Sequence, residues 1–365
     1  VEGAKLSNSV RAALEDLAYV REPAAIIADL EELAREKKRL LFDSATAPEK
    51  LATHYRESGG AADVAVDPIA LMKAQKNAVE LRGARAAHIR DGAAMVEFLA
   101  WFAATAPKGR LSEVSAAQAL ETFRRATGKL KEISFPTISA FGAHAALPHY
   151  RVTTPRDTKI GKGIYLVDSG GQYLDGTTDI TRTTIVGRPV REMRDKYTRV
   201  LKGHIAIATS VFPPGTTGAH LDAFARRALW EAGCDFDHGV GHGVGAYLSV
   251  HEGPQRISKL ANTPLLPGMI LSNEPGYYRE GAYGIRIENL IVVEERKIDG
   301  AERKMLGFET ITFAPIDTAL IDTKLMTGEE IAWLNAYHKA VWEKLQGKVS
   351  TDARKWLKGA TRRIG

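Results

Sequence analysis

The chain has 365 residues, of which 44% are hydrophobic and 26% charged, with 50 Lys and Arg residues against 44 Asp and Glu residues. This composition is typical of a globular protein of about two domains, and it excludes disorder, collagen and coiled coil as the main character of the chain. The single cysteine, Cys234, excludes an internal disulfide and a thiolate zinc cluster, which favours a reducing, cytoplasmic compartment over secretion. No apolar run reaches the length of about 18 residues that a membrane span needs, so we expect no membrane association.

Residues 1–66 are predicted to alternate between helix and strand. This is too little for a stable α/β domain, so we interpret the segment as the end of a larger α/β amino-terminal domain. The earlier part would lie before Val1, and a first residue other than Met fits a trimmed or truncated product. Helical spacing and short apolar runs alternate in the order 23–38, 39–43, 48–57 and 63–66.

A second domain is predicted to cover 67–365. Asp67 and Pro68 form a good helix start, an N-cap followed by proline at the first helical position, and helical spacing then continues to about Ala104. Glycine-punctuated strands alternate with further helices, which predicts an α+β domain with mostly antiparallel strands. The later helices are expected over 115–127, 191–211, 218–232 and 328–344, and the strands over 163–168, 178–186, 268–273, 284–294 and 308–314.

The carboxyl-terminal end of the chain, about 320–365, is predicted to be a basic helical extension. From Lys339 to Gly365 it carries eight basic and two acidic residues, which accounts for the whole net charge of +6. One interpretation is that this tail attracts nucleic acid or another acidic partner. We favour an amphipathic helix docked on the body through Trp342, Leu345 and Trp356, and we expect no nucleic-acid partner.

The first segment that could carry chemistry is YLVDSGGQYLDGTTDITRT, from Tyr165 to Thr183. In a regular hairpin, Asp168 and Asp179, eleven residues apart, could face each other on one side of the sheet. Two adjacent carboxylates repel unless a cation or a proton lies between them. Asp175, before Gly176, needs no ligand, because aspartate is common in turns. The hairpin alone leaves metal binding and turn chemistry as equal alternatives.

The second segment, DHGVGHGVGAYLSVHEGP, holds three histidines in fourteen residues, namely His238, His242 and His251. A lone histidine is more often a satisfied core residue than a ligand, but three in one segment favour a functional role. The glycines between them argue against a regular helix and for a close approach of the backbone to another group.

The third segment joins LSNEPGYY at 271–278 to YGIRIENLIVV at 283–293. Glu274 and Glu288 lie in apolar strand-like runs, where an acid is costly to bury unless it is paired or bound to metal. They are fourteen residues apart, so facing each other requires an odd loop or a bulge. The alternative is that each is an exposed strand residue, with Arg286 as an ion-pair partner.

Charge arithmetic connects the three segments. Four carboxylates from Asp168, Asp179, Glu274 and Glu288 would balance two divalent cations, with His242 as the one nitrogen ligand. Such oxygen-rich ligation suits Mn²⁺, with Co²⁺, Fe²⁺ or Zn²⁺ as competitors. Two metals about 3.5 to 4 Å apart can bridge and deprotonate one water, which becomes the nucleophile for amide hydrolysis.

In this order and spacing, the motifs resemble those of the pita-bread metallopeptidases, and specifically of the long Xaa-Pro aminopeptidases (aminopeptidase P). The resemblance runs from about residue 70 to about residue 340, and all five metal-ligand positions hold the expected residue types. It implies a pita-bread catalytic domain that releases the N-terminal residue from peptides with proline in second position. The matching stretches are VDSGGQYLDGTTDITRT, HGVGHGVG with VHEGP, NEPGYY, GIRIEN, and SFPTISAFGAHAALPHY with its final His-Tyr pair.

The resemblance also implies residue roles. Asp168 and Asp179 would bind one metal and bridge to the second, which Asp179, His242 and Glu274 would bind, while Glu288 would bridge both. Glu274 would also be the general base. The substrate-side residues would be His251 at the carbonyl oxygen, His149 at the leaving nitrogen, His238 in the proline-side pocket, and Arg286.

Three alternatives are weighed against this function. Prolidase, which accepts Xaa-Pro dipeptides, shares the fold, but the histidine motif and the carboxyl-terminal extension favour the aminopeptidase. Methionine aminopeptidase fits less well, because this catalytic block is longer and its motifs differ. A non-catalytic pita-bread binding module typically loses the metal ligands, and here all five residues are intact. The resemblance implies peptide substrates. Family members are usually homodimers, so we also expect a homodimer. Long members carry two amino-terminal domains, and we interpret the start of this chain as part of the second.

Overall fold

The computed structural model describes all 365 residues, and the chain divides into two compact units, Val1–Met72 and Lys73–Gly365. No helix in either unit is both long enough and apolar enough to cross a membrane.

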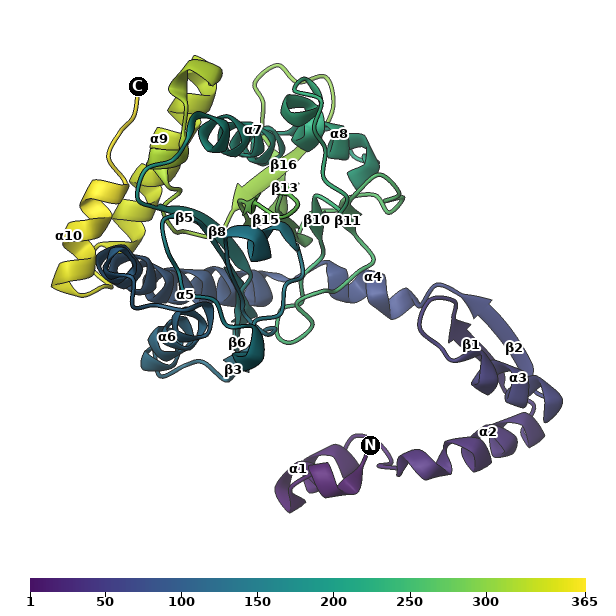
Figure 1. The fold of residues 1–365 in the computed structure, drawn as a ribbon. Coiled ribbons are helices and arrows are strands. Elements are labelled where there is room, and N and C mark those ends of the chain that lie inside the picture. Colours follow the sequence, from purple (N-terminus) through teal and green to yellow (C-terminus); the bar gives the residue numbers. More distant parts are fainter. The chain divides into compact units, whose positions relative to one another are not determined.

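The first unit is a small β-α-β arrangement with additional helices (Figure 1). Its two strands are parallel and pair from Arg39 with Ala61 to Asp43 with Ala65. Tyr55 is fully buried, and its hydroxyl donates to the Lys38 carbonyl at 2.6 Å, which ties α3 to the start of β1. The elements are α1 (Asn8–Glu15), α2 (Ile26–Arg35), β1 (Arg39–Asp43), α3 (Glu49–Glu57) and β2 (Ala61–Ala65).

The single helix expected from Asp67 to Ala104 is two helices, α4 (Pro68–Ala74) and α5 (Ala78–Thr105). Asn77 begins the second one: its side chain accepts the N–H groups of Val79 and Glu80, and its own N–H donates to the Glu80 carboxylate at 2.8 Å. The prediction of one continuous helix is therefore wrong, because this capping box starts a new helix within a stretch of helical spacing.

The second unit is α+β, as the pattern predicts, and all its strand pairs are antiparallel. Its helices after α5 are α6 (Glu113–Ala126), α7 (Arg191–Ala208), α8 (Gly218–Trp230), α9 (Gly328–Leu345) and α10 (Thr351–Ala360). Its strands are β3 (Glu132–Ile133), β4 (Ile138–Phe141), β5 (Gly163–Ser169), β6 (Gly171–Tyr173), β7 (Gly176–Thr177), β8 (Ile180–Val186), β9 (Val211–Phe212), β10 (Gly241–His242), β11 (Arg256–Ile257), β12 (Ile270–Asn273), β13 (Gly276–Arg279), β14 (Tyr283–Arg286), β15 (Asn289–Arg296) and β16 (Met305–Thr310).

Two antiparallel sheets form the centre of this unit (Figure 1). One has the strand order β4-β5-β8, and the apolar faces of α5 and α6 pack against it through residues such as Phe102, Leu120 and Tyr165. The other has the order β12-β15-β16-β9, and α7, α8 and α9 share its core. The helices thus cover the sheets, and the four predicted acidic ligands, Asp168, Asp179, Glu274 and Glu288, lie at or next to the ends of strands of the two sheets.

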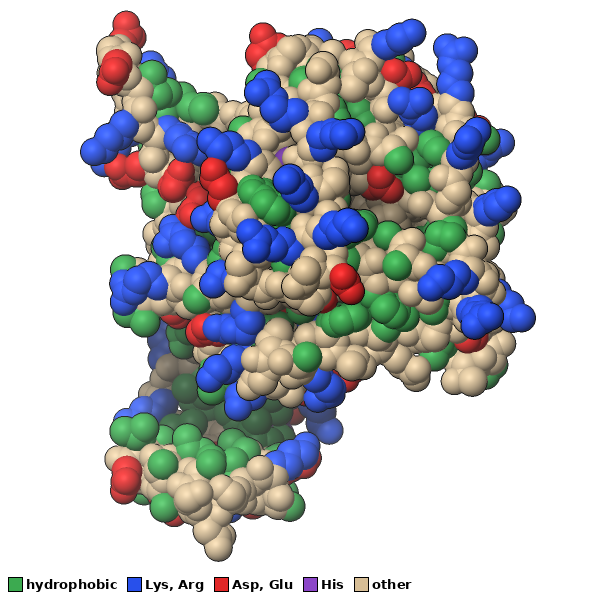
Figure 2. Space-filling model, turned by 90° about the vertical axis from the view of Figure 1, so that its left-hand side faces the viewer, with side chains coloured by type: hydrophobic (Ala, Val, Ile, Leu, Met, Phe, Trp, Pro, Cys, Tyr) green, Lys and Arg blue, Asp and Glu red, His purple; other side chains and the backbone are tan.

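The carboxyl-terminal helices are docked on the second unit, as predicted. Leu345 on α9 and Leu357 on α10 are fully buried, and Trp342 and Trp356 are partly buried against the same core. The basic side chains remain outside. Figure 2 views the side of the molecule on which α9 and α10 lie, and Lys and Arg are spread over that face.

Candidate active site

All nine residues that the sequence singled out line one cavity of about 490 Å³ in the second unit. They come from segments that are far apart in the chain, so the fold itself brings them together. The apolar part of the lining includes Phe135, Pro136 and Ile138. The nine predicted residues are His149, Asp168, Asp179, His238, His242, His251, Glu274, Arg286 and Glu288.

The two aspartates lie at the ends of neighbouring strands, but they do not form a cross-strand pair. Asp168, near the end of β5, pairs with Thr181, and Asp179 comes just before β8 begins at Ile180. The regular hairpin considered from the sequence is therefore not what forms, because the glycine-rich segment between the aspartates makes its own small hairpin, β6 with β7. Both carboxyl groups nevertheless reach the cavity, and both are buried, with exposures of 8% and 4%.

Glu274 and Glu288 come opposite each other through an odd loop, as their even spacing requires. Asn273 pairs with Asn289 and Gly276 with Arg286, so the two glutamates occupy matching positions between these pairs. The hairpin closes after Arg279 pairs with Tyr283, which leaves a loop of three residues, 280–282. Gly281 in this loop has a φ of +69°, the left-handed conformation that three-residue hairpin loops need.

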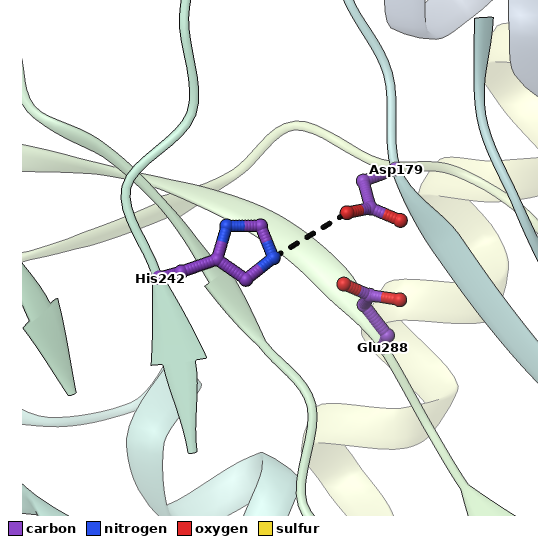
Figure 3. Close-up of side chains that lie close together, drawn as sticks. All are labelled: Asp179, His242 and Glu288. Carbon is purple, nitrogen blue, oxygen red and sulfur yellow. Dashed lines mark ion pairs between the residues drawn. The ribbon is translucent and has the colours of Figure 1, made fainter. Parts of the chain in front are cut away.

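His242 lies on the short strand β10, which glycines allow to approach other backbone closely. A Cβ on Gly241 would collide with the carbonyl of Ser272 on β12, and one on Gly243 would collide with the carbonyl of Glu252. The His242 Nδ1–H donates to the Gly243 carbonyl at 2.9 Å, and its Nε2 is the ring nitrogen that faces the carboxylates. That nitrogen lies 3.5 Å from a carboxylate oxygen of Asp179 (Figure 3). It also lies 3.5 Å from a carboxylate oxygen of Glu274.

The arrangement fits divalent cations. Ligand atoms of Asp179, His242 and Glu288 all lie within 4.8 Å of one another (Figure 3). One carboxylate oxygen of Asp168 and one of Asp179 are buried and have no hydrogen-bond partner. Burial, followed by the charge of Asp168, raises the pKa of Asp179 well above its usual range, and burial, followed by the charge of Asp179, does the same for Glu288. Buried carboxylates that destabilise each other in this way need a compensating positive charge.

Arg286 supplies one positive charge inside this cluster. Its Nη2 donates to Asp168 at 2.6 Å, its Nη1 donates to the Tyr278 hydroxyl at 2.6 Å, and its Nε donates to the Thr181 hydroxyl at 3.1 Å. The guanidinium is almost fully buried. The ion pair with a glutamate considered from the sequence is present with Glu274, at 3.9 Å, but the shorter ion pair is with Asp168. The charge balance predicted from the sequence, four carboxylates against two divalent cations, did not include this positive charge of Arg286.

Three histidines surround the carboxylates. The ring of His251 lies edge to face with that of His242, with 4.2 Å between the ring centroids. His238 Nδ1–H donates to the Gly239 carbonyl at 2.7 Å, and its Nε2 accepts from the Tyr278 hydroxyl at 2.8 Å. Burial, followed by the charge of Arg286, lowers the pKa of His238 to about 4, so this ring is neutral near pH 7. His149 is exposed at the edge of the cavity.

Three supporting residues were not identified from the sequence. Tyr278 joins His238 to Arg286, the Thr181 hydroxyl donates to a Glu288 oxygen at 2.7 Å, and the Ser272 hydroxyl donates to Glu274 at 3.0 Å. All three lie within the segments already singled out. Their hydroxyl groups give no signal of their own, because serine, threonine and tyrosine are common on any strand.

Comparison with known families matches residues 82–295 to the metallopeptidase family M24 and residues 304–364 to the C-terminal region of peptidase M24. Two curated relatives are a probable Xaa-Pro aminopeptidase P of Coccidioides posadasii, 44% identical over 100% of this chain and 62% of its own length, and aminopeptidase P1 of Lotus japonicus, 46% identical over 82% of this chain and 49% of its own length. The chain thus spans roughly half to three-fifths of the curated relatives that it matches.

Solved structures with the same fold include two peptidases. X-prolyl aminopeptidase from Caenorhabditis elegans, described as a cytosolic enzyme with a di-nuclear active site, superposes with a TM-score of 0.93 at 36% identity, covering 100% of this chain and 61% of that one. Xaa-Pro dipeptidase from Bacillus anthracis gives a TM-score of 0.66 at 28% identity, covering 79% of this chain and 77% of that one.

Proposed function

This chain belongs to metallopeptidase family M24 and has the pita-bread fold, and from that premise we propose that it is a metal-dependent aminopeptidase for peptides with proline in second position. The observation that carries the proposal is the buried cluster of four carboxylates and one imidazole in a single cavity beside three further histidines. The names of the relatives support the preference for proline.

We propose that Asp168, Asp179, His242, Glu274 and Glu288 hold two divalent cations. The orphaned oxygens of the two aspartates and the Nε2 of His242, which faces the carboxylates, would bind them. Bound divalent cations would polarise the scissile carbonyl and make water a nucleophile near neutral pH. With Arg286 included, the cluster and two such ions would carry one surplus positive charge, which favours a reaction that develops negative charge on oxygen.

The chain's own residues would handle the protons and the substrate. Glu274, whose pKa burial raises, would take the proton of the attacking water. His251, next to His242, would donate to the carbonyl oxygen as it becomes negative, and the exposed His149 would donate to the departing proline nitrogen. His238 would line the proline side of the cavity. A substrate contact by Arg286 stays a prediction.

Prolidase activity on Xaa-Pro dipeptides is the second candidate. It shares the fold, because Xaa-Pro dipeptidase from Bacillus anthracis superposes on this chain. The relatives that match this chain over most of its length are aminopeptidases, which favours longer peptides as substrates. We further propose Mn²⁺ as the native metal, a cytoplasmic location and a homodimeric state; the oxygen-rich donor set supports the first of these.

The test is hydrolysis by metal-stripped protein to which Mn²⁺, Co²⁺ or Zn²⁺ is added back, with the bound metal counted. Arg-Pro-Pro is the diagnostic substrate, an Xaa-Pro dipeptide reports prolidase, and a Met-Ala peptide reports methionine aminopeptidase. We expect release of arginine from Arg-Pro-Pro with about two metals per chain. Two bound metals without cleavage of any of the three peptides would refute the proposed activity of this chain, and absence of metal binding would favour the binding-module alternative.

A further inference from the structure

A buried polar network, which includes the charged side chain of Arg182, lies at the ends of β12 and β15. At its centre is His204 on α7, whose side chain is fully buried. It contacts Asn273, the last residue of β12, and Asn289, the first residue of β15. These two asparagines pair with each other across the strands.

The hydrogen bonds define how His204 is held. Its Nδ1 lies 3.1 Å from the Asn273 carbonyl oxygen, so Nδ1 carries the proton and donates. Its Nε2 then accepts from the side-chain amide of Asn289, also at 3.1 Å. In return, the Asn273 amide donates to the His204 carbonyl at 2.9 Å. Burial, followed by the charge of Arg182, lowers the pKa of His204 to about 3, which keeps the ring neutral in this arrangement.

The network continues to Glu288 through Arg182 on β8. The Arg182 Nη2 donates to the Asn289 side-chain oxygen at 2.8 Å and to the Tyr337 hydroxyl on α9 at 2.8 Å. Its Nη1 donates to the backbone carbonyl of Glu288 at 2.6 Å. Helices α7 and α9 are therefore linked by hydrogen bonds to the backbone that carries Glu288.

The position of the asparagines gives this network a consequence for the cavity. Asn273 immediately precedes Glu274, and Asn289 immediately follows Glu288, so a single histidine contacts the neighbour of each glutamate, through the backbone carbonyl of Asn273 and the side-chain amide of Asn289. The buried carboxylates repel one another, and a strand end without this anchor would be free to move its glutamate away from the others. Groups behind a metal site that orient the ligands commonly set metal affinity.

We propose that His204 is a positioning residue that holds Glu274 and Glu288 at the spacing needed to bind metal, an inference that rests on the proposed function for its metal site. His204 acts through Asn273 and Asn289 and touches neither the substrate nor the reacting atoms. Its two ring nitrogens have separate tasks, Nδ1 toward the strand that carries Glu274 and Nε2 toward the strand that carries Glu288.

Two substitutions separate these tasks. His204→Asn keeps a donor near the position of Nδ1 but removes the acceptor for Asn289, and His204→Gln keeps an acceptor near the position of Nε2 but removes the donor to Asn273. The matched control is His88→Asn. His88 is an equally buried histidine on α5 whose Nδ1 donates to the Ala84 carbonyl, away from both asparagines.

The measurements are Mn²⁺ binding to the metal-free full chain by calorimetry, the visible absorption spectrum of the Co²⁺ form, and thermal unfolding. We expect each His204 variant to bind Mn²⁺ about 10-fold or more weakly and to show an altered Co²⁺ spectrum. His88→Asn should lose stability but keep the affinity and the spectrum of the wild type. Folded His204 variants with wild-type affinity and spectrum would overturn the proposal, as would equal losses in the His88 control.

A milder variant covers the case in which the His204 variants do not fold. Tyr337→Phe removes one hydroxyl that contacts both Arg182 and Asn289, while its ring keeps its stacking on Trp333. We expect a several-fold weaker Mn²⁺ affinity, and an unchanged affinity would refute the network's role. These readouts use no peptide, so they test the role of His204 separately from the proposed activity. A wild type that binds metal without cleaving Arg-Pro-Pro would refute the proposed activity but not the role of His204. A wild type that binds no metal would overturn both.

Discussion

Replacing Gly241 by alanine should displace His242 without changing any of the predicted metal ligands. An added Cβ would lie 1.9 Å from the Ser272 carbonyl oxygen, whereas ordinary contacts begin at 3.4 Å, so β10 and β12 must separate by about 1.5 Å at this point. His242 is the next residue, and its Nε2 lies 3.5 Å from both Asp179 and Glu274. Overpacking of this kind costs about 1 to 3 kcal/mol of stability, and a misplacement of about 1 Å can lower the rate about 100-fold.

The assay for Gly241→Ala combines thermal unfolding, Mn²⁺ binding to the metal-free protein and hydrolysis of Arg-Pro-Pro. We expect a lower melting temperature, at least about 10-fold weaker metal binding and about 100-fold slower turnover. Gly239→Ala is the matched control in the same segment, because its Cβ would come no closer than 3.3 Å to a neighbouring atom and needs only a small adjustment. Wild-type metal affinity and turnover in Gly241→Ala would refute the argument that this glycine sets the position of His242.

Three further predictions follow from other parts of the second unit. Asp179→Asn should abolish metal binding and turnover while the fold survives, as measured by bound metal and circular dichroism; turnover with full metal content would contradict its assignment as a ligand. His149→Ala should keep its metals and lower kcat, because this exposed residue is not one of the proposed metal ligands. Loss of metal from this variant would contradict that assignment. His338 is buried and accepts the Ile316 N–H at 3.1 Å, and burial lowers its pKa to about 4. Since the unfolded chain binds this proton near pH 6.5, His338 alone should lower the stability by about 1.6 kcal/mol between pH 6.5 and pH 5. Urea unfolding of metal-free His338→Gln should lack that part of the loss.

Much of the site could be predicted because its residues lie in short segments with distinctive composition. All nine predicted residues line one cavity, and the even spacing of Glu274 and Glu288 correctly required an odd loop. The glycines around His242 indicated close backbone approach, which the contacts of Gly241 confirm. These inferences succeed because side-chain alternation and the space left by glycine are local properties of the chain.

Other features depended on contacts that local spacing does not encode. The aspartates are not paired across the strands, because the segment between them forms a separate hairpin. The helix from Asp67 breaks at Asn77, where capping outweighs helical spacing. The place of Arg286 among the carboxylates follows from β14 lying next to β5 and β8.

The sequence by itself singled out the residues that line the cavity, since residue type and local spacing express hydrogen-bonding capacity, charge and backbone freedom. It also determined the α+β class, because apolar periodicity follows the faces that must be buried. Only the tertiary structure decided that His204 holds both Asn273 and Asn289, since these residues are 69 and 85 positions away in the chain. It also decided which aspartate Arg286 pairs with and how the four carboxylates share one buried space, because long-range packing sets distances that no local pattern specifies.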